Sequence, residues 1–356
     1  MPFVEDMRDV EVIAPNFKRR LSGVTSTIIQ LVPVQNRLGQ KVATLGPGLP
    51  GDLPAMRWRD LPALWKAPGR RPLRIWHARR NIEMLPGILL RDVLRMKLKL
   101  VFTSASQRRH SAWTRLLVSR MDAVVATSRK TASYLGVPNT VVMHGIDVER
   151  FSPPADKAAA KAACGLNSGQ KFAGCFGRVR HQKGTDLFVD AMIALLPSRP
   201  GWSAIVAGRT TPQHAAFEAG LRQRVRNAGL ADRILFVGEH ADINRWYRAL
   251  DLFVAPQRWE GFGLTPLEAM ASGVPVVATD VGAFSEQIVG GAGETGILVG
   301  PDDLPAMVEA AAAFLDDDGR REAAGHRGRS HVTANFAIEN EARQLGLVYA
   351  QAIGGD

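Results

Sequence analysis

The sequence feature that most constrains the fold is a regular alternation of short apolar runs with segments of helical length. The strand-like runs span residues 10–16, 41–46, 73–77, 98–104, 123–128 and 140–144, then 172–176, 203–207, 233–237, 252–255, 274–280 and 296–299. The intervening segments of helical length include 25–38, 186–196, 214–228, 242–250, 265–271 and 304–315. Strands separated by helices predict βαβ units and a parallel sheet, and here the pattern occurs twice.

The alternation is interrupted near residues 150–173, where Phe151-Ser152-Pro153-Pro154 precedes an alanine-rich stretch. A chain of 356 residues is long enough to form two domains, each with its own core. We therefore predict an α/β protein of two doubly wound, Rossmann-like domains, residues 1–155 and 165–335, that face each other across a cleft. Ligands of such folds bind at the carboxyl ends of the strands.

Composition and charge exclude several classes of protein. The apolar runs are too short to cross a bilayer, and the first residues lack the basic, apolar pattern of a signal peptide, so a cytoplasmic chain is expected. Cys164 and Cys175 have no partners at metal-ligand spacing and are expected to be reduced, structural thiols. Residues 1–150 hold 25 Lys and Arg against 11 Asp and Glu, whereas residues 151–356 hold 20 against 23. The basic half is expected to meet an anionic partner, but it lacks a recognised nucleic-acid motif, so nucleic acid is not the predicted partner.

The most informative segment is residues 259–278. Gly261 and Gly263 follow a predicted strand, Thr265 is the expected helix N-cap with Pro266 at the first helical position, and Gly273 is the expected C-cap. Backbone N–H groups at such a helix N-terminus favour a phosphate or a sugar hydroxyl.

Two carboxylates, Glu260 and Glu268, flank this turn with seven residues between them. They are able to accept hydrogen bonds from ligand hydroxyls, and the alternative is that both are solvated surface charges. Their arrangement within a strand–loop–helix–strand segment favours the binding role.

The segment resembles the E-x7-E signature of the GT-B retaining glycosyltransferases of family 4, the group 1 type. Gly177-Arg178 and Lys183-Gly184 resemble the diphosphate-binding G-R-x4-K-G stretch of that family, and Leu21-Ser22-Gly23-Val24 resembles its N-terminal glycine loop. Residues 17–27 and 104–110 look similar to mannosyltransferases of lipopolysaccharide core assembly. The resemblance implies a GT-B fold with an N-terminal acceptor domain and a C-terminal nucleotide-sugar domain, and a C-terminal helix, about 336–356, that packs back on the first domain.

The resemblance also implies roles for individual residues. Arg178 and Lys183 would bind the donor diphosphate, Glu260 the hydroxyls of the transferred sugar and Glu268 the ribose. The whole predicted donor site comprises Ser22, Gly23, Gly177, Arg178, Lys183, Gly208, Arg209, Glu260, Gly261, Phe262, Gly263, Leu264, Thr265 and Glu268. The acceptor hydroxyl would attack from the front face and the β-phosphate would take its proton. No cofactor and no divalent metal is expected, because cationic side chains stabilise the leaving diphosphate.

Three histidines are candidates in the first domain. Many family members carry a histidine just after the strand that matches 98–104, and this sequence lacks it there. Ser104, Ser106, Gln107 or His110 is expected to replace it. His110 is counted as a catalytic candidate together with Glu260, Arg178 and Lys183. His144 stands where the family usually has Asn and is expected to alter an interdomain hydrogen bond, whereas His77 fits a cleft position and a structural one equally well.

The implied activity is transfer of mannose from GDP-mannose to a lipopolysaccharide core or another anionic, lipid-linked saccharide. ADP-, UDP- and dTDP-sugars remain open as donors, and a sugar-nucleotide epimerase or hydrolase is the alternative enzyme. Peripheral association with the cytoplasmic face of the inner membrane is expected. Residues 88–100 interleave leucines with Arg91, Arg95, Lys97 and Lys99 and predict a basic amphipathic segment in the headgroup layer, or else an ordinary surface helix.

Overall fold

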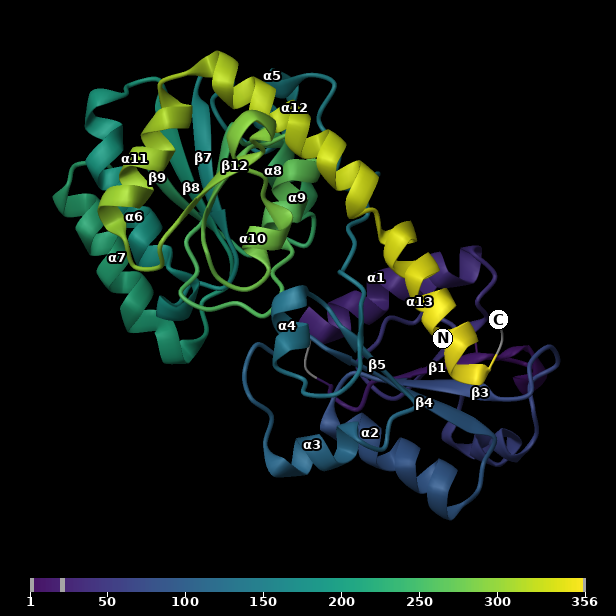
Figure 1. The fold of residues 1–356 in the computed structure, drawn as a ribbon. Coiled ribbons are helices and arrows are strands. Elements are labelled where there is room, and N and C mark those ends of the chain that lie inside the picture. The colour runs from purple at the N-terminus through teal and green to yellow at the C-terminus, as the bar shows by residue number, and fades with distance from the viewer. Residues whose placement is uncertain (1–2, 20–22, 355–356) are drawn as a thin grey trace. The chain divides into compact units, whose positions relative to one another are not determined.

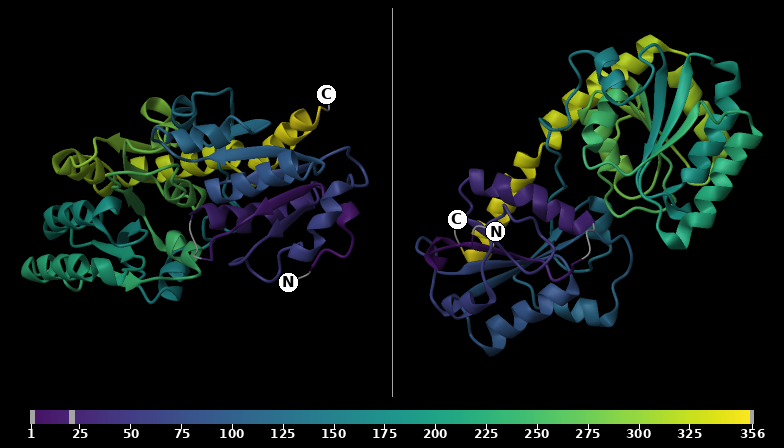
Figure 2. Two further views of the ribbon diagram at one scale, coloured as in Figure 1. Left: turned by 90° about the horizontal axis from the view of Figure 1, so that it is seen from below. Right: turned by 180° about the vertical axis from the view of Figure 1, so that it is seen from behind.

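The structure is a computed structural model that describes residues 3–19 and 23–354. It divides into two compact units. Unit 1 comprises Met1–Gly145 and Ile338–Asp356, and unit 2 comprises Ile146–Ala337. Within the described residues, each unit contains one sheet of six strands with helices packed against it (Figure 1, Figure 2). All strand pairs are parallel, so the predicted α/β fold class is confirmed.

The sheet of unit 1 has the strand order β2-β1-β3-β4-β5-β6. Its strands are β1 (Val12–Pro15), β2 (Val42–Leu45), β3 (Arg74–Ala78), β4 (Leu98–Ser104), β5 (Ala123–Ala126) and β6 (Thr140–Val141). Its helices are α1 (Gly23–Arg37), α2 (Asn81–Ile88), α3 (Ala112–Val118), α4 (Arg129–Ser133) and α13 (Ile338–Ile353). Short 3-10 helices span Met7–Asp9 and Trp58–Trp65, and a π-helical turn, Leu89–Val93, continues α2.

The sheet of unit 2 has the order β12-β11-β10-β7-β8-β9. Its strands are β7 (Lys171–Phe176), β8 (Trp202–Ala207), β9 (Ile234–Gly238), β10 (Leu252–Ala255), β11 (Val276–Thr279) and β12 (Gly296–Val299). The helices are α5 (Lys157–Ala163), α6 (Thr185–Leu195), α7 (Ala215–Asn227), α8 (Ile243–Ala249), α9 (Thr265–Ala271), α10 (Phe284–Gln287), α11 (Leu304–Leu315) and α12 (Asp318–Asn335). Short 3-10 helices span His181–Lys183, Leu196–Ser198, Pro212–His214 and Gly291–Gly293.

Every predicted strand is present because each run supplies apolar side chains that are buried or partly buried in one of the two sheets. Helix α12 was not predicted. Its sequence is polar on all sides, and Gly325 and Gly328 allow it to pack closely on Gly273 and Met270. The close packing of small residues gives little periodic signal.

The C-terminal helix α13 belongs to unit 1, whereas α12 belongs to unit 2. Its apolar face joins the core beside α1 through Ile338, Ala342, Leu345, Val348 and Tyr349. Gln40 adds a hydrogen bond from its Nε2 to the carbonyl of Ala342 at 2.6 Å. The first unit is therefore completed by a segment that lies some 200 residues later in the chain than its last strand.

Residues 88–100 do not form the single surface helix that was the alternative prediction, whereas their place in a headgroup layer stays a prediction. The π-helical turn ends at Val93, and β4 begins at Leu98. Arg91 is ion-paired with Asp92 and Asp122, and Lys99 also pairs with Asp122. Two of the four predicted docking charges are thus already neutralised by neighbouring carboxylates. None of the helices that the structure describes is long and apolar enough to cross a membrane.

Candidate active site

The candidate site in unit 2 lies where the sheet changes direction. From the central strand β7 the chain moves outward through β8 and β9, then returns to place β10 on the other side of β7. The loops that follow β7 and β10 therefore leave the sheet side by side at its carboxyl edge. Ligands of doubly wound folds bind at this kind of switch point.

A pocket of about 230 Å³ opens at this edge. Six of its lining residues belong to the predicted donor site, namely Gly177, Arg178, Gly208, Arg209, Thr265 and Glu268. The remaining lining residues are Phe176, Ala207, Glu239, His240, Ile243 and Tyr247. The fold thus gathers into one pocket residues that are up to 92 positions apart in the sequence.

Two glycines allow the ends of β7 and β8 to meet beside the pocket. Gly208 has a φ of +149°, and a Cβ added to it would lie 1.7 Å from the carbonyl oxygen of Gly177. No other residue fits at position 208 without moving the backbone. Arg178 and Arg209, whose side chains are exposed, follow these glycines directly. The close approach of the two strand ends therefore fixes the backbone positions from which both arginine side chains extend.

Glu268 is held by a buried tyrosine. The Tyr247 hydroxyl, from α8, donates a hydrogen bond of 2.8 Å to Glu268 Oε2. Burial raises the pKa of Glu268, although the hydrogen bond from Tyr247 acts in the opposite direction. The pKa of Tyr247 is raised well above its usual value by burial and by the Glu268 charge, so Tyr247 remains a donor. This fixes the orientation of one carboxylate oxygen.

Lys183 and Glu260 contact each other directly. The Lys183 ammonium group is hydrogen-bonded to Glu260 Oε2, while the backbone N–H of Gly261 donates to Oε1 at 3.0 Å. The two side chains keep 19% and 18% of their surface exposed. The residue predicted to bind the diphosphate and the residue predicted to bind the sugar are therefore paired with each other.

An ion pair joins the loop that follows β10 to the first turn of α6. Arg258 donates from Nη1 to Asp186 Oδ1 at 2.7 Å and to the carbonyl of His181 at 2.6 Å. Burial alone would raise the pKa of Asp186, but the hydrogen bonds and charge of Arg258 outweigh it and lower the pKa. Gly184 also lies against the carbonyl oxygen of Pro256, so the loop carrying Lys183 is fixed to the loop carrying Glu260.

The helix after this loop begins one residue earlier than predicted. The N-cap of α9 is Leu264, which makes no side-chain capping bond, and Thr265 is the first helical residue with Pro266 second. At the other end Ser272 is the C-cap, and Gly273 follows it with a φ of +75°. The predictions of Thr265 as N-cap and Gly273 as C-cap are each wrong by one position. The loop before α9 is held by Gln287, whose Nε2 donates to the carbonyls of Phe262 and Gly263.

Arg180 was not predicted to be a site residue. It is half-buried, and among the described residues its Nε has no hydrogen-bond partner. Burial and the neighbouring charge of Arg178 lower its pKa, and the charge of Glu260 opposes this. Arg178, Arg180 and Lys183 place several cations in one loop, which favours an anionic ligand. Nothing in the local pattern distinguished Arg180 from an ordinary surface arginine.

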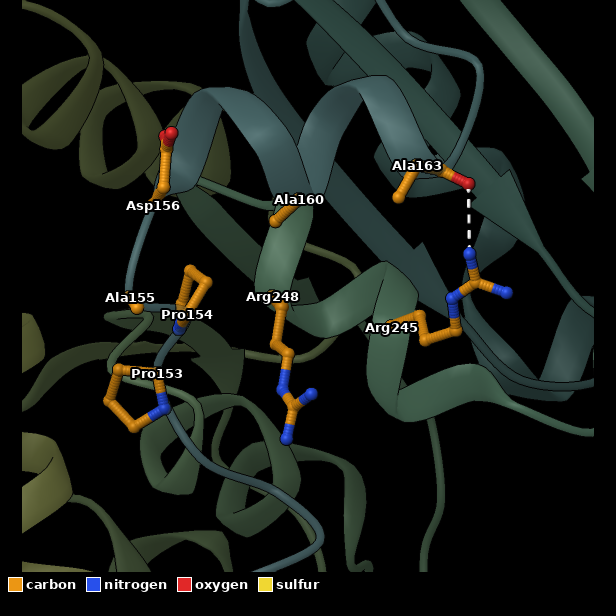
Figure 3. A pocket seen from close by; sticks show the side chains of 8 residues that line it. All are labelled: Pro153, Pro154, Ala155, Asp156, Ala160, Ala163, Arg245 and Arg248. Atoms are coloured by element: carbon orange, nitrogen blue, oxygen red, sulfur yellow. Dashed lines mark hydrogen bonds between the residues drawn. The ribbon is translucent and has the colours of Figure 1, made fainter.

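A second pocket, of about 320 Å³, lies between α5 and α8 (Figure 3). Arg245 and Arg248 enter it from α8, opposite Ala160 of α5 and the Pro153–Asp156 segment. Arg245 donates to the carbonyl of Ala163 at 3.1 Å, and Arg248 donates to the carbonyl of Ser152 at 3.0 Å. These arginines hold α5 and the preceding segment in place, and none of the predicted site residues lines this pocket.

In unit 1, His77 and His144 both take part in hydrogen bonds to the C-terminal helix. The two ring nitrogens of His77 contact the Tyr349 hydroxyl at 2.7 Å and Thr103 Oγ1 at 2.6 Å, and burial keeps its pKa well below the usual value. Of the two positions left open for His77, the structural one is correct. His144 Nδ1 lies 2.8 Å from Glu341 Oε1.

His110 lies in the loop between β4 and α3. It is half-buried, and its Nε2 is 3.5 Å from Ser104 Oγ, which also accepts a hydrogen bond from the backbone of Ser106. Burial and the charge of Arg108 lower its pKa, so the imidazole is neutral near pH 7. Gly23 begins α1, and Ser22 lies outside the described residues.

A family model described as "Glycosyl transferases group 1" matches residues 170–317, which include the whole pocket. The chain is 71% identical over 97% of its length to LpsB of Rhizobium meliloti (strain 1021), a lipopolysaccharide core biosynthesis mannosyltransferase, and covers 98% of that protein. The chain belongs to the group 1 glycosyltransferases. It is also 58% identical to LpcC of Rhizobium leguminosarum bv. viciae, a lipopolysaccharide core biosynthesis mannosyltransferase, over 98% of each chain.

This group 1 glycosyltransferase has the predicted GT-B fold. HepE of Anabaena, solved in complex with UDP, superposes with a TM-score of 0.82 at 17% identity, covering 96% of this chain and 100% of that one. In the part of the chain that the structure describes, no group of three or more His, Cys, Asp or Glu side chains is arranged to hold a metal ion. Whether the enzyme works without a metal remains a prediction.

Proposed function

We propose that this glycosyltransferase transfers mannose from GDP-mannose to a saccharide of the lipopolysaccharide core, with retention of configuration. The high identity over nearly full length to two lipopolysaccharide core mannosyltransferases supports both the sugar and the acceptor. The observation that carries the proposal is the pocket at the switch point of unit 2, in which Arg178 and Arg209 lie near Glu268. Cations and an oriented carboxylate in one pocket suit the diphosphate and ribose of a nucleotide sugar.

In this proposal Glu268 binds the ribose. Its carboxylate already accepts from Tyr247 through Oε2, which leaves Oε1 directed by that bond toward a ligand hydroxyl. Arg178 is exposed at the pocket wall, and its planar fork suits a diphosphate. Arg180, with its buried Nε, adds positive charge beneath the same phosphates.

Donor binding then requires the Lys183–Glu260 pair to separate. The diphosphate competes with Glu260 for the Lys183 ammonium group, and the released Glu260 carboxylate becomes free to accept hydrogen bonds from the mannose hydroxyls. The backbone N–H groups of Phe262 to Leu264 are further proposed ligands of the diphosphate. The ion pair thus gives each of the two partly buried charges a partner of opposite charge, which the bound donor then replaces.

For the chemical step, the acceptor hydroxyl oxygen forms a bond to the anomeric carbon of mannose on the face that the diphosphate leaves. The bond from that carbon to the β-phosphate oxygen breaks, its electron pair leaves with GDP, and the hydroxyl proton passes to a β-phosphate oxygen. Arg178 and Lys183 stabilise the charge that develops on the leaving diphosphate, so no divalent metal is required. His110, neutral near pH 7, is proposed to hydrogen-bond the transferred sugar.

The acceptor is proposed to be anionic and linked to lipid in the cytoplasmic face of the inner membrane. The excess of 25 Lys and Arg over 11 Asp and Glu in residues 1–150 supports this assignment. A peripheral association follows, since the acceptor lies at that surface.

A thermal-shift panel of GDP, UDP, ADP and dTDP, each with and without its sugar, tests the donor. A ligand at 100 times its Kd stabilises the folded state by about 2.7 kcal/mol, which raises the unfolding temperature measurably. We expect stabilisation by GDP and GDP-mannose that is reduced in Arg178→Ala. Stabilisation by UDP but not by GDP would contradict the mannosyl assignment. GDP released at the same rate with and without acceptor would indicate a hydrolase.

A further inference from the structure

The outer side of α2, the π-helical turn and α3 carries large apolar side chains where a water-facing helix usually carries charge. The exposed residues, called the apolar face below, are Trp65, Ile82, Leu85, Leu89, Val93, Leu94, Trp113 and Leu116. Val93 is 66% exposed, Leu116 56% and Trp113 50%. Positions 82, 85, 89 and 93 follow one another at intervals of three or four residues, so they project from one side of the helix. Exposed apolar residues gathered in this way indicate an interaction surface.

The apolar face is a built surface, because polar bonds join the segments that carry it. Asn81 Nδ2 donates to Thr114 Oγ1 at 2.8 Å and connects the first turns of α2 and α3. Trp65 Nε1 donates to the carbonyl of Leu94 at 2.7 Å, and Arg91 pairs with Asp122 at 2.5 Å. The labels α2 and α3 lie next to each other on the same flank of the unit 1 sheet (Figure 1).

The core of unit 1 does not need these side chains. Helix α2 faces the sheet with Glu83, Met84 and Gly87, all buried. Gly87 brings the helix close to Trp76, since an added Cβ would lie 2.7 Å from the indole. The residues on the opposite side of α2 are therefore available for a partner.

Charge indicates which partner the apolar face meets. Residues 81–122 include eight Lys and Arg but only three Asp and Glu. The acidic residues are already paired, Glu83 with Arg80, Asp92 with Arg91 and Arg120, and Asp122 with Arg91 and Lys99. The segments that carry or adjoin the face have the exposed cations Lys66, Arg95, Lys97, Arg108, Arg109 and Arg115. An apolar centre with tryptophans and a basic border matches the headgroup region of an anionic bilayer.

We propose that the apolar face inserts into the headgroup region of an anionic bilayer and holds unit 1 on that surface. This deepens the proposed function, because it rests on an acceptor that lies in such a bilayer. Helix α2 begins just after β3, and α3 follows the loop that carries His110, so both start at the carboxyl edge of the sheet. Docking through the apolar face keeps this edge, with His110, near the acceptor lipid. The insertion of apolar side chains distinguishes this proposal from attraction by charge alone, which salt would abolish.

Co-sedimentation of the purified full chain with vesicles tests the proposal. The vesicles contain phosphatidylglycerol and phosphatidylethanolamine, and binding is measured at low and high salt. The variant Leu89→Gln/Val93→Gln/Trp113→Gln/Leu116→Gln should lower the partition coefficient more than tenfold at both salt concentrations. Leu347→Gln is the matched control, because Leu347 is a leucine of α13 that is 65% exposed and lies outside the apolar face. It should partition like the parent protein, whereas Arg95→Ser/Lys97→Ser should weaken binding mainly at low salt.

Equal partitioning of the fourfold variant and the parent protein would overturn the proposal. So would a change from dimer to monomer in sedimentation velocity with unchanged vesicle binding, because the apolar face would then join two copies of the chain. If the fourfold variant does not fold, Val93→Gln and Trp113→Gln are measured singly, and each should reduce partitioning at high salt.

Mannose transfer to a water-soluble core oligosaccharide separates this proposal from the proposed function. The fourfold variant should transfer at the parental rate in that assay. A parent protein that binds vesicles but transfers no mannose to any core saccharide would contradict the proposed function and leave the docking surface intact.

Discussion

Replacing Glu260 by Gln should tighten the binding of free GDP while slowing mannose transfer. Glu260 is hydrogen-bonded to the Lys183 ammonium group, and in the proposed function this pair separates before the lysine binds a phosphate. Glutamine removes the charge that holds Lys183 and still offers an oxygen to the backbone N–H of Gly261, as Glu260 Oε1 does at 3.0 Å. GDP carries no sugar and so loses nothing from the substitution, whereas transfer loses a carboxylate contact to mannose.

The expected magnitude follows from the exposure of the pair. About a fifth of each side chain remains accessible, 19% for Lys183 and 18% for Glu260. A fully exposed ion pair is worth about 0.2–1 kcal/mol, and a buried charge-assisted hydrogen bond is worth about 1.5–3 kcal/mol. The Lys183–Glu260 pair should lie between these two values. A cost of about 1 kcal/mol corresponds to roughly a fivefold lower Kd for GDP once the pair is removed.

Isothermal titration with GDP measures this change directly. Lys183→Ala should weaken GDP binding on the order of tenfold to a hundredfold, because the cation itself is lost. Glu294→Gln is the control for the change in net charge, since Glu294 pairs with Arg320 and lies outside the pocket lining. Weaker GDP binding by a correctly folded Glu260→Gln variant would refute the argument that this carboxylate competes with the nucleotide for Lys183.

Four further outcomes are expected. Arg178→Ala should raise the KM for GDP-mannose on the order of tenfold to a hundredfold. EDTA should leave the parental rate unchanged in steady-state assays, and a metal requirement there would contradict the metal-free mechanism. Gly208→Ala should lower the free energy of unfolding in denaturant by about 1–3 kcal/mol or more. Residue 208 has a φ of +149°, and the new Cβ would meet the Gly177 carbonyl oxygen. An unchanged denaturation midpoint would contradict this geometry. The pKa of His77 is lowered in the folded state, so the unfolded chain binds a proton at this histidine at higher pH than the folded chain does. The free energy of unfolding should therefore fall as the pH drops below about 6.5. His77→Gln should reduce this dependence of the free energy of unfolding on pH.

The strands and the position of the candidate pocket were predictable because their signals are local. Apolar runs of strand length recur along the chain, and the glycines beside Arg178 and Glu260 follow predicted strands. The partners of these residues were not predictable. The Lys183–Glu260 pair joins residues 77 positions apart, and the hydrogen bond from Tyr247 to Glu268 depends on how α8 packs beside α9. Such contacts arise from the order of the strands, which the spacing of motifs does not specify.

The local structure of 88–100 and of α12 was not predictable for a related physical reason. The leucines and cations of 88–100 suggested a basic amphipathic segment or an ordinary surface helix, but a π-helical turn ends at Val93 and a buried strand begins at Leu98. Two of the four cations in this region, Arg91 and Lys99, are ion-paired with Asp92 or Asp122, the latter from beyond β4. Neither the irregular turn nor the cross-segment pairing leaves a periodic pattern, and α12 escaped prediction because its packing depends on two glycines.

Direct observation of the transfer reaction tests the central claim most closely. The purified enzyme is incubated with a lipopolysaccharide core acceptor and, in parallel reactions, GDP-mannose, UDP-, ADP- and dTDP-sugars, and the product is analysed by mass spectrometry and NMR. The account predicts that one mannose is added from GDP-mannose, that the new linkage keeps the α configuration of the donor, and that Arg178→Ala and Lys183→Ala lose most of this activity. Transfer from another nucleotide sugar but not from GDP-mannose, or a β-linked product, would contradict it.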